Sequence, residues 1–368
     1  MKFTCDRSIL LKEISIANEI IASKNAISIL SNILIEAADG NIVIKATDMK
    51  VNFETTVPVD VIEPGSITVY GDKFYGILSS IPDGEIEFDY SDNRINIKTT
   101  VKKAKFQLKS IASEKFPEFT VSGQNFFEIP VKDFKEMIYQ TIFAISDDET
   151  RYFMNGVFFE KSEDNFIMVA TDGRRLAYIK KPVADDSNIA DIPGVIIPPK
   201  ILNIVLRRAG DEGMVKLSVS DKFIFIQFGT YKLSSVLIEG QFPNYRRVIP
   251  EKQEHSFTVK RQEMLDALKR VSLLVEQKSH RIYLGLAPGM ASVYCEESDI
   301  GTAREEIFSE YNGEELSIAL NYRYLEDPFK SIGGDEICIL FNDPNKTITI
   351  TPVPEKDYFH IVMPMQQE

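Results

Sequence analysis

The chain has 368 residues, of which 44% are hydrophobic and 26% are charged, a composition typical of a globular protein with two to three domains. No apolar run approaches the length needed to cross a membrane, so an integral membrane protein is not expected. The net charge of −13 argues, taken alone, against a nucleic-acid partner, because phosphate binding needs lysine and arginine.

A pattern of a short strand followed by an amphipathic helix occurs three times, starting at Phe3, Phe127 and Phe257. In each copy, apolar residues recur at i, i+4, i+7 and i+11, which is one face of a helix. The three stripes are Leu10, Ile14, Ala17 and Ile21, then Phe134, Ile138, Thr141 and Ile145, and then Met264, Leu268, Val271 and Val275. Later in the copies stand the pairs Thr47-Asp48, Thr171-Asp172 and Ser298-Asp299, at similar distances from each phenylalanine. We therefore predict three similar domains at 1–122, 123–250 and 251–368.

Alternating runs separated by turn residues follow each helix. In the first copy, Asp39-Gly40 lies between two such runs, which is a strong signal for a hairpin. Each unit then has a second short helix and further strands. One domain is predicted to be strand, helix and three strands, formed twice, an α+β architecture with two helices on one side of an antiparallel sheet.

The charge is unevenly distributed between the predicted helices and the rest of the chain. The six predicted helices, 7–24, 72–81, 131–145, 199–209, 260–275 and 322–331, have 15 basic and 9 acidic residues, and the remainder has 27 basic and 46 acidic. The plain interpretation is that helix surfaces favour lysine and arginine. The alternative is a basic helical surface that faces an anionic partner.

Motifs for catalysis or cofactor binding are missing from the sequence. It has no phosphate-binding glycine loop, dinucleotide fingerprint or nucleophile elbow. Its three histidines, His255, His280 and His360, are far apart, and its three cysteines lack metal-ligand spacing. We expect no enzyme activity, no metal and no cofactor, and reduced thiols in a cytoplasmic protein. The opening Met1-Lys2-Phe3-Thr4 enters the first repeat directly, so no signal peptide is expected.

Strand-rich repeats have exposed edges that must be covered or paired. Repeats that pair head to tail form either a filament or a closed ring, and a ring suits a globular protein better. If three domains do not complete a circle alone, the first domain of one chain would join the third domain of another.

Two segments exceed what the fold needs, namely 170–177 and the C-terminal 361–368. The paired methionines around Pro364 are consistent with a frayed end, as is usual for termini. They are also consistent with an adaptable apolar wall that accepts peptides.

These residues together resemble a known family. The resemblance covers essentially the whole chain and rests on Met1-Lys2-Phe3-Thr4, on 151–156 (RYFMNG), on 170–177 (ATDGRRLA), on 242–250 (FPNYRRVIP) and on 362–365 (VMPM). The sequence is similar to the bacterial DNA polymerase III beta subunit, the processivity sliding clamp. This resemblance implies a non-catalytic, homodimeric ring of six similar domains, with helices lining a central hole and sheets outside.

The resemblance implies two kinds of partner and the residues that meet them. Double-stranded DNA would be held without sequence specificity by Lys24, Lys200 and Arg207, with Tyr152 and Phe153 nearby. Replicative and other polymerases, the clamp loader and repair proteins would dock through short peptides rich in Gln and large apolar residues. Their pocket would consist of Met154, Thr171, Gly173, Arg175, Leu176, Pro243, Val248, Thr347, Ile361, Met363, Pro364 and Met365.

The chain departs from the family pattern at Arg174, Met154 and Gln366, which bears on the peptide preference. The resemblance further implies a dimer contact of Phe106 and Leu108 in the first domain with Leu273 and Leu274 in the third. Two other functions stay open: a peptide-binding scaffold without DNA, which the basic helices disfavour, and an enzyme with an unrecognised site.

Overall fold

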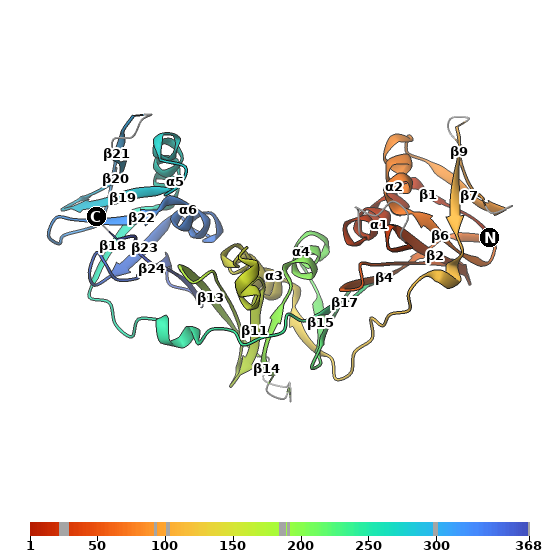
Figure 1. Cartoon of the computed structure of the whole chain (residues 1–368), viewed down its shortest axis with the longest axis horizontal. Coiled ribbons are helices and arrows are strands. Elements are labelled where there is room, and N and C mark those ends of the chain that lie inside the picture. The colour runs from red at the N-terminus through yellow and green to blue at the C-terminus, as the bar shows by residue number, and fades with distance from the viewer. Residues whose placement is uncertain are drawn as a thin grey trace. The chain divides into compact units, whose positions relative to one another are not determined.

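The computed structural model describes residues 1–21, 29–91, 94–100, 104–183, 189, 192–296 and 301–366. The chain divides into two compact units, Met1–Lys132 with Lys200–Leu237, and Asp133–Pro199 with Ile238–Glu368. All strand pairs within the described residues are antiparallel. Figure 1 labels the helices and strands along the chain.

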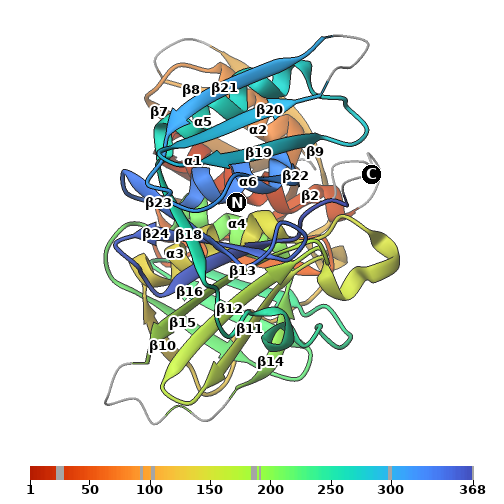
Figure 2. The same cartoon turned by 90° about the vertical axis from the view of Figure 1, so that its left-hand side faces the viewer.

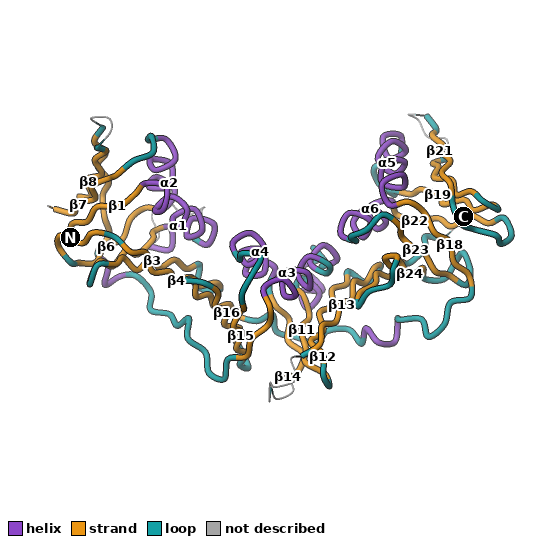
Figure 3. Tube along the Cα trace, turned by 180° about the vertical axis from the view of Figure 1, so that it is seen from behind, coloured by secondary structure: helices purple, strands orange, loops and turns teal. Residues whose placement is uncertain are grey.

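The first unit is built on a 13-stranded sheet in the order β10-β15-β16-β17-β4-β3-β2-β6-β9-β8-β7-β1-β5. Its strands are β1 (Lys2–Asp6), β2 (Asn32–Ala38), β3 (Asn41–Thr47), β4 (Val51–Pro58), β5 (Asp60–Glu63), β6 (Gly65–Tyr70), β7 (Glu85–Ser91), β8 (Arg94–Thr99), β9 (Lys105–Ile111), β10 (Phe127–Pro130), β15 (Met214–Val219), β16 (Phe223–Phe228) and β17 (Tyr231–Val236). Helices α1 (Arg7–Ile20) and α2 (Gly71–Ser80) lie side by side against this sheet (Figure 3).

The second unit has an eight-stranded and a four-stranded sheet, in the orders β14-β11-β12-β13-β25-β24-β23-β18 and β21-β20-β19-β22. The strands are β11 (Val157–Ser162), β12 (Asn165–Thr171), β13 (Arg175–Pro182), β14 (Ile192–Ile197), β18 (His255–Lys260), β19 (Arg281–Ala287), β20 (Met290–Cys295), β21 (Ala303–Phe308), β22 (Leu316–Asn321), β23 (Glu336–Phe341), β24 (Ile348–Val353) and β25 (Tyr358–Val362). Figure 2 looks onto the four-stranded sheet with α5 (Arg261–Val271) packed behind it.

All six predicted helices occur. The remaining three are α3 (Val131–Tyr139), α4 (Pro199–Arg208) and α6 (Tyr322–Ser331). Eleven of the twelve residues in the predicted stripes are buried, and Ile145 is half-buried. The helix predicted over 131–145 ends early, because the hydroxyl of Thr141 donates to the carbonyl of Met137 at 2.7 Å and the chain then tightens into a 3₁₀ turn.

The predicted succession of strand, helix and three strands holds in all three repeats and occurs twice in each. The hairpin predicted at Asp39-Gly40 is confirmed, since both residues have the positive φ, 50° and 72°, that a tight two-residue turn requires. Of the three Thr-Asp or Ser-Asp pairs, Ser298-Asp299 lies outside the described residues.

Each repeat exchanges its first strands between its two halves. Strand β1 pairs with β7, β10 with β15 and β18 with β23, which places the marker residues Phe3, Phe127 and Phe257 in the buried core. Phe3, for example, stacks on Phe88 with ring centroids 4.8 Å apart. The central repeat contributes strands to both compact units, because β15, β16 and β17 continue the sheet of β4 whereas β11, β12 and β13 continue that of β25. Strand β10 belongs to the first unit through its pairing with β15.

The repeats are joined to each other by their last strands. Strand β4 of the first repeat pairs with β17 of the second, with Phe53 opposite Leu233. Strand β13 of the second repeat pairs with β25 of the third, with Ala177 opposite His360. In both junctions, the third strand of a first half meets the third strand of a second half.

Candidate functional site

The proposed peptide site is built on the junction of β13 and β25 in the second unit. Leu176 and Ile361 lie directly opposite each other across this junction, and both side chains are buried. They share one apolar cluster with Phe242 and Tyr245, which come from the segment after β17. The sheet register therefore brings together three of the segments that the resemblance assigned to the pocket.

The exposed part of the same region has two apolar side chains. Val248, at the end of a 3₁₀ turn (Tyr245–Val248), is 50% exposed, and Met363, directly after β25, is 49% exposed. Four further residues of the proposed pocket are half-buried: Pro243, Thr347, Pro364 and Met365. We call these six residues, with Leu176 and Ile361 beneath them, the junction patch.

The chain end is tied down beside this patch. The backbone N–H of Met363 donates to the carbonyl of Arg174 at 2.9 Å, and that of Met365 donates to the carbonyl of Ala319 at 2.8 Å. A frayed end is therefore wrong for Met363 to Met365, since both residues have backbone hydrogen bonds to other elements.

The turn between β12 and β13 is shaped by Asp172. One of its carboxylate oxygens accepts the backbone N–H groups of Arg174 and Arg175, at 2.9 and 3.0 Å. Between Asp172 and Arg174, Gly173 has φ +87°, a conformation that favours glycine, and a Cβ there would lie 2.9 Å from Nη1 of Arg151. Gly173 is thus required by the turn and by its neighbour.

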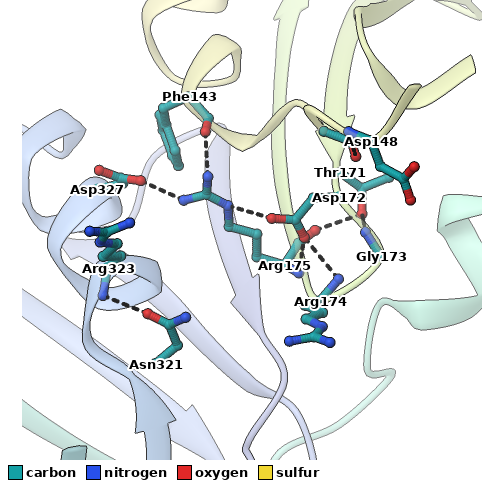
Figure 4. A network of polar contacts seen from close by, with 11 residues as sticks. Phe143, Asp148, Thr171, Asp172, Gly173, Arg174, Arg175, Asn321, Arg323 and Asp327 are labelled. Atoms are coloured by element: carbon teal, nitrogen blue, oxygen red, sulfur yellow. Dashed lines mark hydrogen bonds and ion pairs between the residues drawn. The ribbon is translucent and has the colours of Figure 1, made fainter. Parts of the chain in front are cut away.

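Arg175 connects three elements of the second unit (Figure 4). Its Nε donates to Asp172 Oδ2 at 3.1 Å, its Nη1 to Asp327 Oδ2 on α6 at 2.5 Å, and its Nη2 to the carbonyl of Phe143 at 2.6 Å. The guanidinium also lies over the rings of Phe143 and Tyr324, at 5.6 and 4.8 Å from their centroids. Arg175 therefore has every guanidinium nitrogen engaged, and it braces the turn rather than standing free at a rim.

The equivalent turn of the first unit has the same construction. Asp48 Oδ1 accepts the backbone N–H groups of Lys50 and Val51, at 2.9 and 2.7 Å. Its Oδ2 accepts from Nζ of Lys200 on α4 at 2.6 Å. In each turn, the aspartate of the repeated Thr-Asp pair therefore also binds a basic side chain. That side chain is Lys200 on α4 in the first turn, and Arg175, which in turn binds Asp327 on α6, in the second.

A buried histidine lies behind Arg175. His360 Nε2 is 3.2 Å from Oε1 of Gln140, whose own Nε2 donates to the carbonyl of Ser331 at 2.8 Å. Since Oε1 only accepts, the imidazole donates from Nε2. Burial, and after it the charge of Arg175, lower the pKa of His360 to about 3, so this histidine is neutral at physiological pH.

Met154 is buried and ends a 3₁₀ segment (Glu149–Met154), where its carbonyl accepts from the N–H of Ser146 at 2.9 Å. Asp148, which caps this segment, accepts from the hydroxyl of Thr150 and from Arg151, and these bonds lower its pKa to about 2. Met154 is not part of the apolar cluster that contains Leu176, whereas Phe153 packs against that cluster.

The residues expected to face DNA have different environments. Tyr152 is 51% exposed and its ring contacts Phe153 edge to face. The ammonium of Lys200 is held by Asp48 and by the carbonyl of Ile20 at 2.8 Å. Arg207 Nη2 lies 2.6 Å from Glu19 Oε2, with about half of its side chain exposed. Lys24 lies outside the described residues.

Several basic helix residues are thus already paired with carboxylates. Arg208 shares Glu19 with Arg207, Arg270 binds Glu305, and Lys330 binds Glu326. The count of helical charges therefore overestimates the positive charge available to a ligand.

The four residues expected at a dimer contact lie in strand β9 and in the 3₁₀ turn that follows α5. Phe106 and Leu108 are half-buried on one face of β9 and alternate with exposed Lys105, Gln107 and Lys109, as a strand period of two predicts. Leu273 is 75% exposed and Leu274 is half-buried, both in the 3₁₀ turn (Ser272–Leu274) that ends α5.

Sequence reasoning missed the residues that α6 brings to the Arg175 network. Asp327 binds Arg175 directly, Tyr324 stacks on it, and Asn321 caps the helix by accepting from the N–H of Arg323 at 3.0 Å. A single sequence has no signal that α6 lies next to Arg175, because this contact depends on the register between β13 and β25.

Neither metal clusters nor membrane spans appear in the described part of the chain. No three His, Cys, Asp or Glu side chains gather there in a way that would hold a metal ion. Its helices are also too short or too polar to cross a membrane.

Comparison with known proteins extends over the whole chain. Models of the DNA polymerase III beta subunit match at residues 1–120 for the N-terminal domain, 128–244 for the central domain and 246–366 for the C-terminal domain. The beta sliding clamp of Treponema pallidum is 47% identical over 100% of both chains, and that of Caulobacter vibrioides is 32% identical over 100% of both.

Solved structures agree with this result. The Pseudomonas aeruginosa sliding clamp bound to griselimycin has a TM-score of 0.93 at 28% identity, and the Bacillus subtilis sliding clamp has a TM-score of 0.92 at 25% identity. Each match covers 100% of both chains. The chain has three domains of the DNA clamp fold and belongs to the DNA polymerase III beta subunit family, the beta sliding clamps, which are non-catalytic processivity subunits of the polymerase.

Proposed function

We propose that two copies of this chain close into a ring of six domains that encircles and slides along duplex DNA in the cytoplasm. The domains would span 1–122, 123–250 and 251–368, close to the limits of the three family models. Held by topology, such a ring needs no tight or sequence-specific DNA contact, and strong contacts would slow its sliding.

The observation that carries this proposal is the pairing rule at the junctions. The last strand of a first half pairs with the last strand of a second half, as β4 does with β17 and β13 with β25. Two last strands are left over, β21 of the third repeat and β9 of the first. Among the described strands, β21 pairs only with β20. Strand β9 pairs with β8 on one edge, and on its other edge it pairs with β6 only through Ser110 and Ile111.

A second copy supplies the missing partners. To form the same kind of junction, β21 of one chain would pair with β9 of a second chain. When β21 of the second chain also pairs with β9 of the first, the assembly is closed. Phe106 and Leu108 on β9, together with Leu273 and Leu274 after α5, would provide the apolar part of this contact. This arrangement is head to tail, like the two junctions within the chain.

We further propose that the junction patch binds short peptides of polymerases, the clamp loader and repair proteins. Val248 and Met363 offer exposed apolar surface, Met residues adapt to different side chains, and the bonded backbone of 363–365 fixes the wall. Thr171, Gly173 and Arg175 would act mainly by holding the turn that carries Leu176 and the contact to Met363.

For the DNA-facing residues, we propose that Tyr152, Phe153, Lys24 and Arg207 lie toward the duplex. Lys200 would reach a phosphate only by exchanging its bond to Asp48, since its ammonium is engaged there. The proposal is tested by loading the protein on closed circular DNA and measuring its release when the circle is cut.

A further inference from the structure

We infer that the peptides bound at the junction patch carry acidic residues beside their apolar anchors, and that Arg174, Arg247 and Lys346 select them. This inference rests on the proposed peptide-binding function and specifies its partner. It assigns a role to three basic residues that do not belong to the apolar cluster.

Arg174 is fixed next to the exposed end of the patch. Its carbonyl accepts from the N–H of Met363, and its own N–H donates to Asp172. The carboxylate of Asp172 is already committed to backbone N–H groups and to Nε of Arg175. Figure 4 shows the exposed side chain of Arg174 directed away from the Arg175 guanidinium and Asp327. It has a hydrogen bond with the Tyr324 side chain, which carries no charge that would neutralise the guanidinium.

Arg247 differs from its neighbour Arg246. Nη2 of Arg246 lies 2.5 Å from Oε1 of Glu160, and its guanidinium covers the ring of Tyr245, so this residue fastens the 3₁₀ turn to β11. Arg247 is exposed, immediately precedes the exposed Val248, and has no ion pair with a carboxylate of the described residues.

Lys346 occupies the third side of the patch. Ile348 and Val362 lie opposite each other in the β24–β25 pair. Lys346 and Thr347, just before β24, are therefore at the same end of the sheet as Met363, just after β25. The Lys346 side chain is exposed and, within the described ranges, forms no ion pair. The carbonyl of Thr347 accepts from Nε2 of Gln253 at 3.0 Å, which fixes the backbone there.

Three cations without an ion pair among the described residues stand beside exposed Val248 and Met363, in a chain of net charge −13. In such a chain, carboxylates are abundant, and several basic residues of the same unit, such as Lys181 with Glu136 and Arg270 with Glu305, are paired. Apolar side chains inside a basic rim complement a segment that has apolar anchors and flanking carboxylates. The aliphatic anchors favour a peptide over a nucleic acid, which would require stacking surfaces.

The experiment uses the full chain and two labelled peptides. Their common core has one Gln and three large apolar residues, and they differ only in having two Asp or two Asn on each side of the core. Binding is measured by fluorescence anisotropy at low and at high salt. We expect the Asp peptide to bind about fivefold to tenfold more tightly at low salt, and the difference to shrink at high salt, as for partly exposed charge pairs.

Single variants assign the effect to residues. Arg174→Glu, Arg247→Glu and Lys346→Glu are each expected to remove or reverse the preference, while the Asn peptide keeps its affinity. The matched control is Lys356→Glu, an exposed lysine in the loop at the opposite end of the same β24–β25 hairpin, and it should leave both affinities unchanged. Circular dichroism and urea midpoints verify that the variants fold.

The outcomes separate this inference from the proposed function. Equal binding of the Asp and Asn peptides overturns the acidic preference while peptide docking stands. If neither peptide binds, the proposed function of the patch fails. Displacement of the Asp peptide by a single-stranded oligothymidylate as efficiently as by unlabelled Asp peptide would mean that the basic rim binds phosphates, which also overturns the inference.

Discussion

The guanidinium of Arg175 and the carboxylate of Asp327 are joined by a hydrogen-bonded ion pair of 2.5 Å between Nη1 and Oδ2. The two residues are 152 positions apart and belong to the second and third repeats. Their side chains are 12% and 32% exposed, so the pair is partly shielded from water. Through this contact, the turn beside the junction patch depends on a helix of the next repeat.

Replacing Asp327 should therefore loosen the turn. We expect Asp327→Asn to lower the free energy of unfolding by about 1.5–3 kcal/mol, the range for a hydrogen bond to a charged group. Urea denaturation followed by circular dichroism measures this. Glu326→Gln, which breaks only the surface pair with Lys330 at 2.8 Å, is the neighbouring control and should cost at most about 0.5 kcal/mol. Equal effects of the two substitutions would show that the brace contributes little.

Gly173 should tolerate no side chain. Gly173→Ala is expected to cost about 1–2 kcal/mol, because φ +87° strains an alanine and its Cβ would lie 2.9 Å from Nη1 of Arg151. Gly76→Ala is the contrasting variant: this exposed glycine lies inside α2 with nothing within 4 Å, so alanine should stabilise the protein by about 0.5–1 kcal/mol. A neutral Gly173→Ala substitution would contradict the assigned role of the turn.

His360 should make stability fall in mild acid. Its folded pKa of about 3 lies below the ordinary value of 6.5, so the unfolded state binds more protons between these two pH values. Stability from the neutral imidazole is therefore present above pH 6.5 and is lost as the pH falls toward 3, by at most about 1.4 kcal/mol per pH unit.

The measurement compares urea midpoints of the natural protein and of His360→Asn between pH 8 and pH 5. The variant should lose part of the pH dependence below 6.5, whereas His255→Asn, at an exposed position, should retain it. Proton titration of the imidazole by NMR provides a second reading. A His360 resonance that titrates near pH 6 would contradict its burial.

Leu273 and Leu274 should control assembly. We expect the double substitution of both leucines by Asp to yield a folded monomer, because charge would be placed in an apolar contact. Sedimentation velocity at micromolar concentration distinguishes monomer from dimer. Met214→Asp, an exposed apolar residue of β15 in the first unit, is the control and should remain dimeric. A stable dimer of the double variant would place the contact elsewhere.

Local patterns in the sequence predict much of the fold. The stripe Leu10, Ile14 and Ala17 is buried along α1, and Asp39-Gly40 forms its hairpin turn, because helix periodicity and turn residues act over short distances. The exchange of first strands and the pairing of β13 with β25 were not predicted, because register between distant strands depends on tertiary packing.

The site was predictable only in part for the same reason. Leu176 and Ile361, assigned through the family resemblance, do lie together in one cluster. The resemblance implies that Arg175 belongs to the peptide pocket, but its guanidinium contacts Asp327, and no sequence pattern links these two residues. Likewise, the resemblance implies that Lys200 holds DNA, and the sequence has no signal for the bond that its ammonium forms with Asp48.

The central claim is that the chain encircles DNA, and release at free ends tests it most directly. The protein is loaded onto nicked circular duplex DNA with its clamp loader, isolated by gel filtration, and the circle is then cut with a restriction enzyme. We predict that the protein stays on the circle at moderate salt and leaves within minutes of linearisation, unless bulky blocks close both ends. Retention on linear DNA with open ends would contradict the ring.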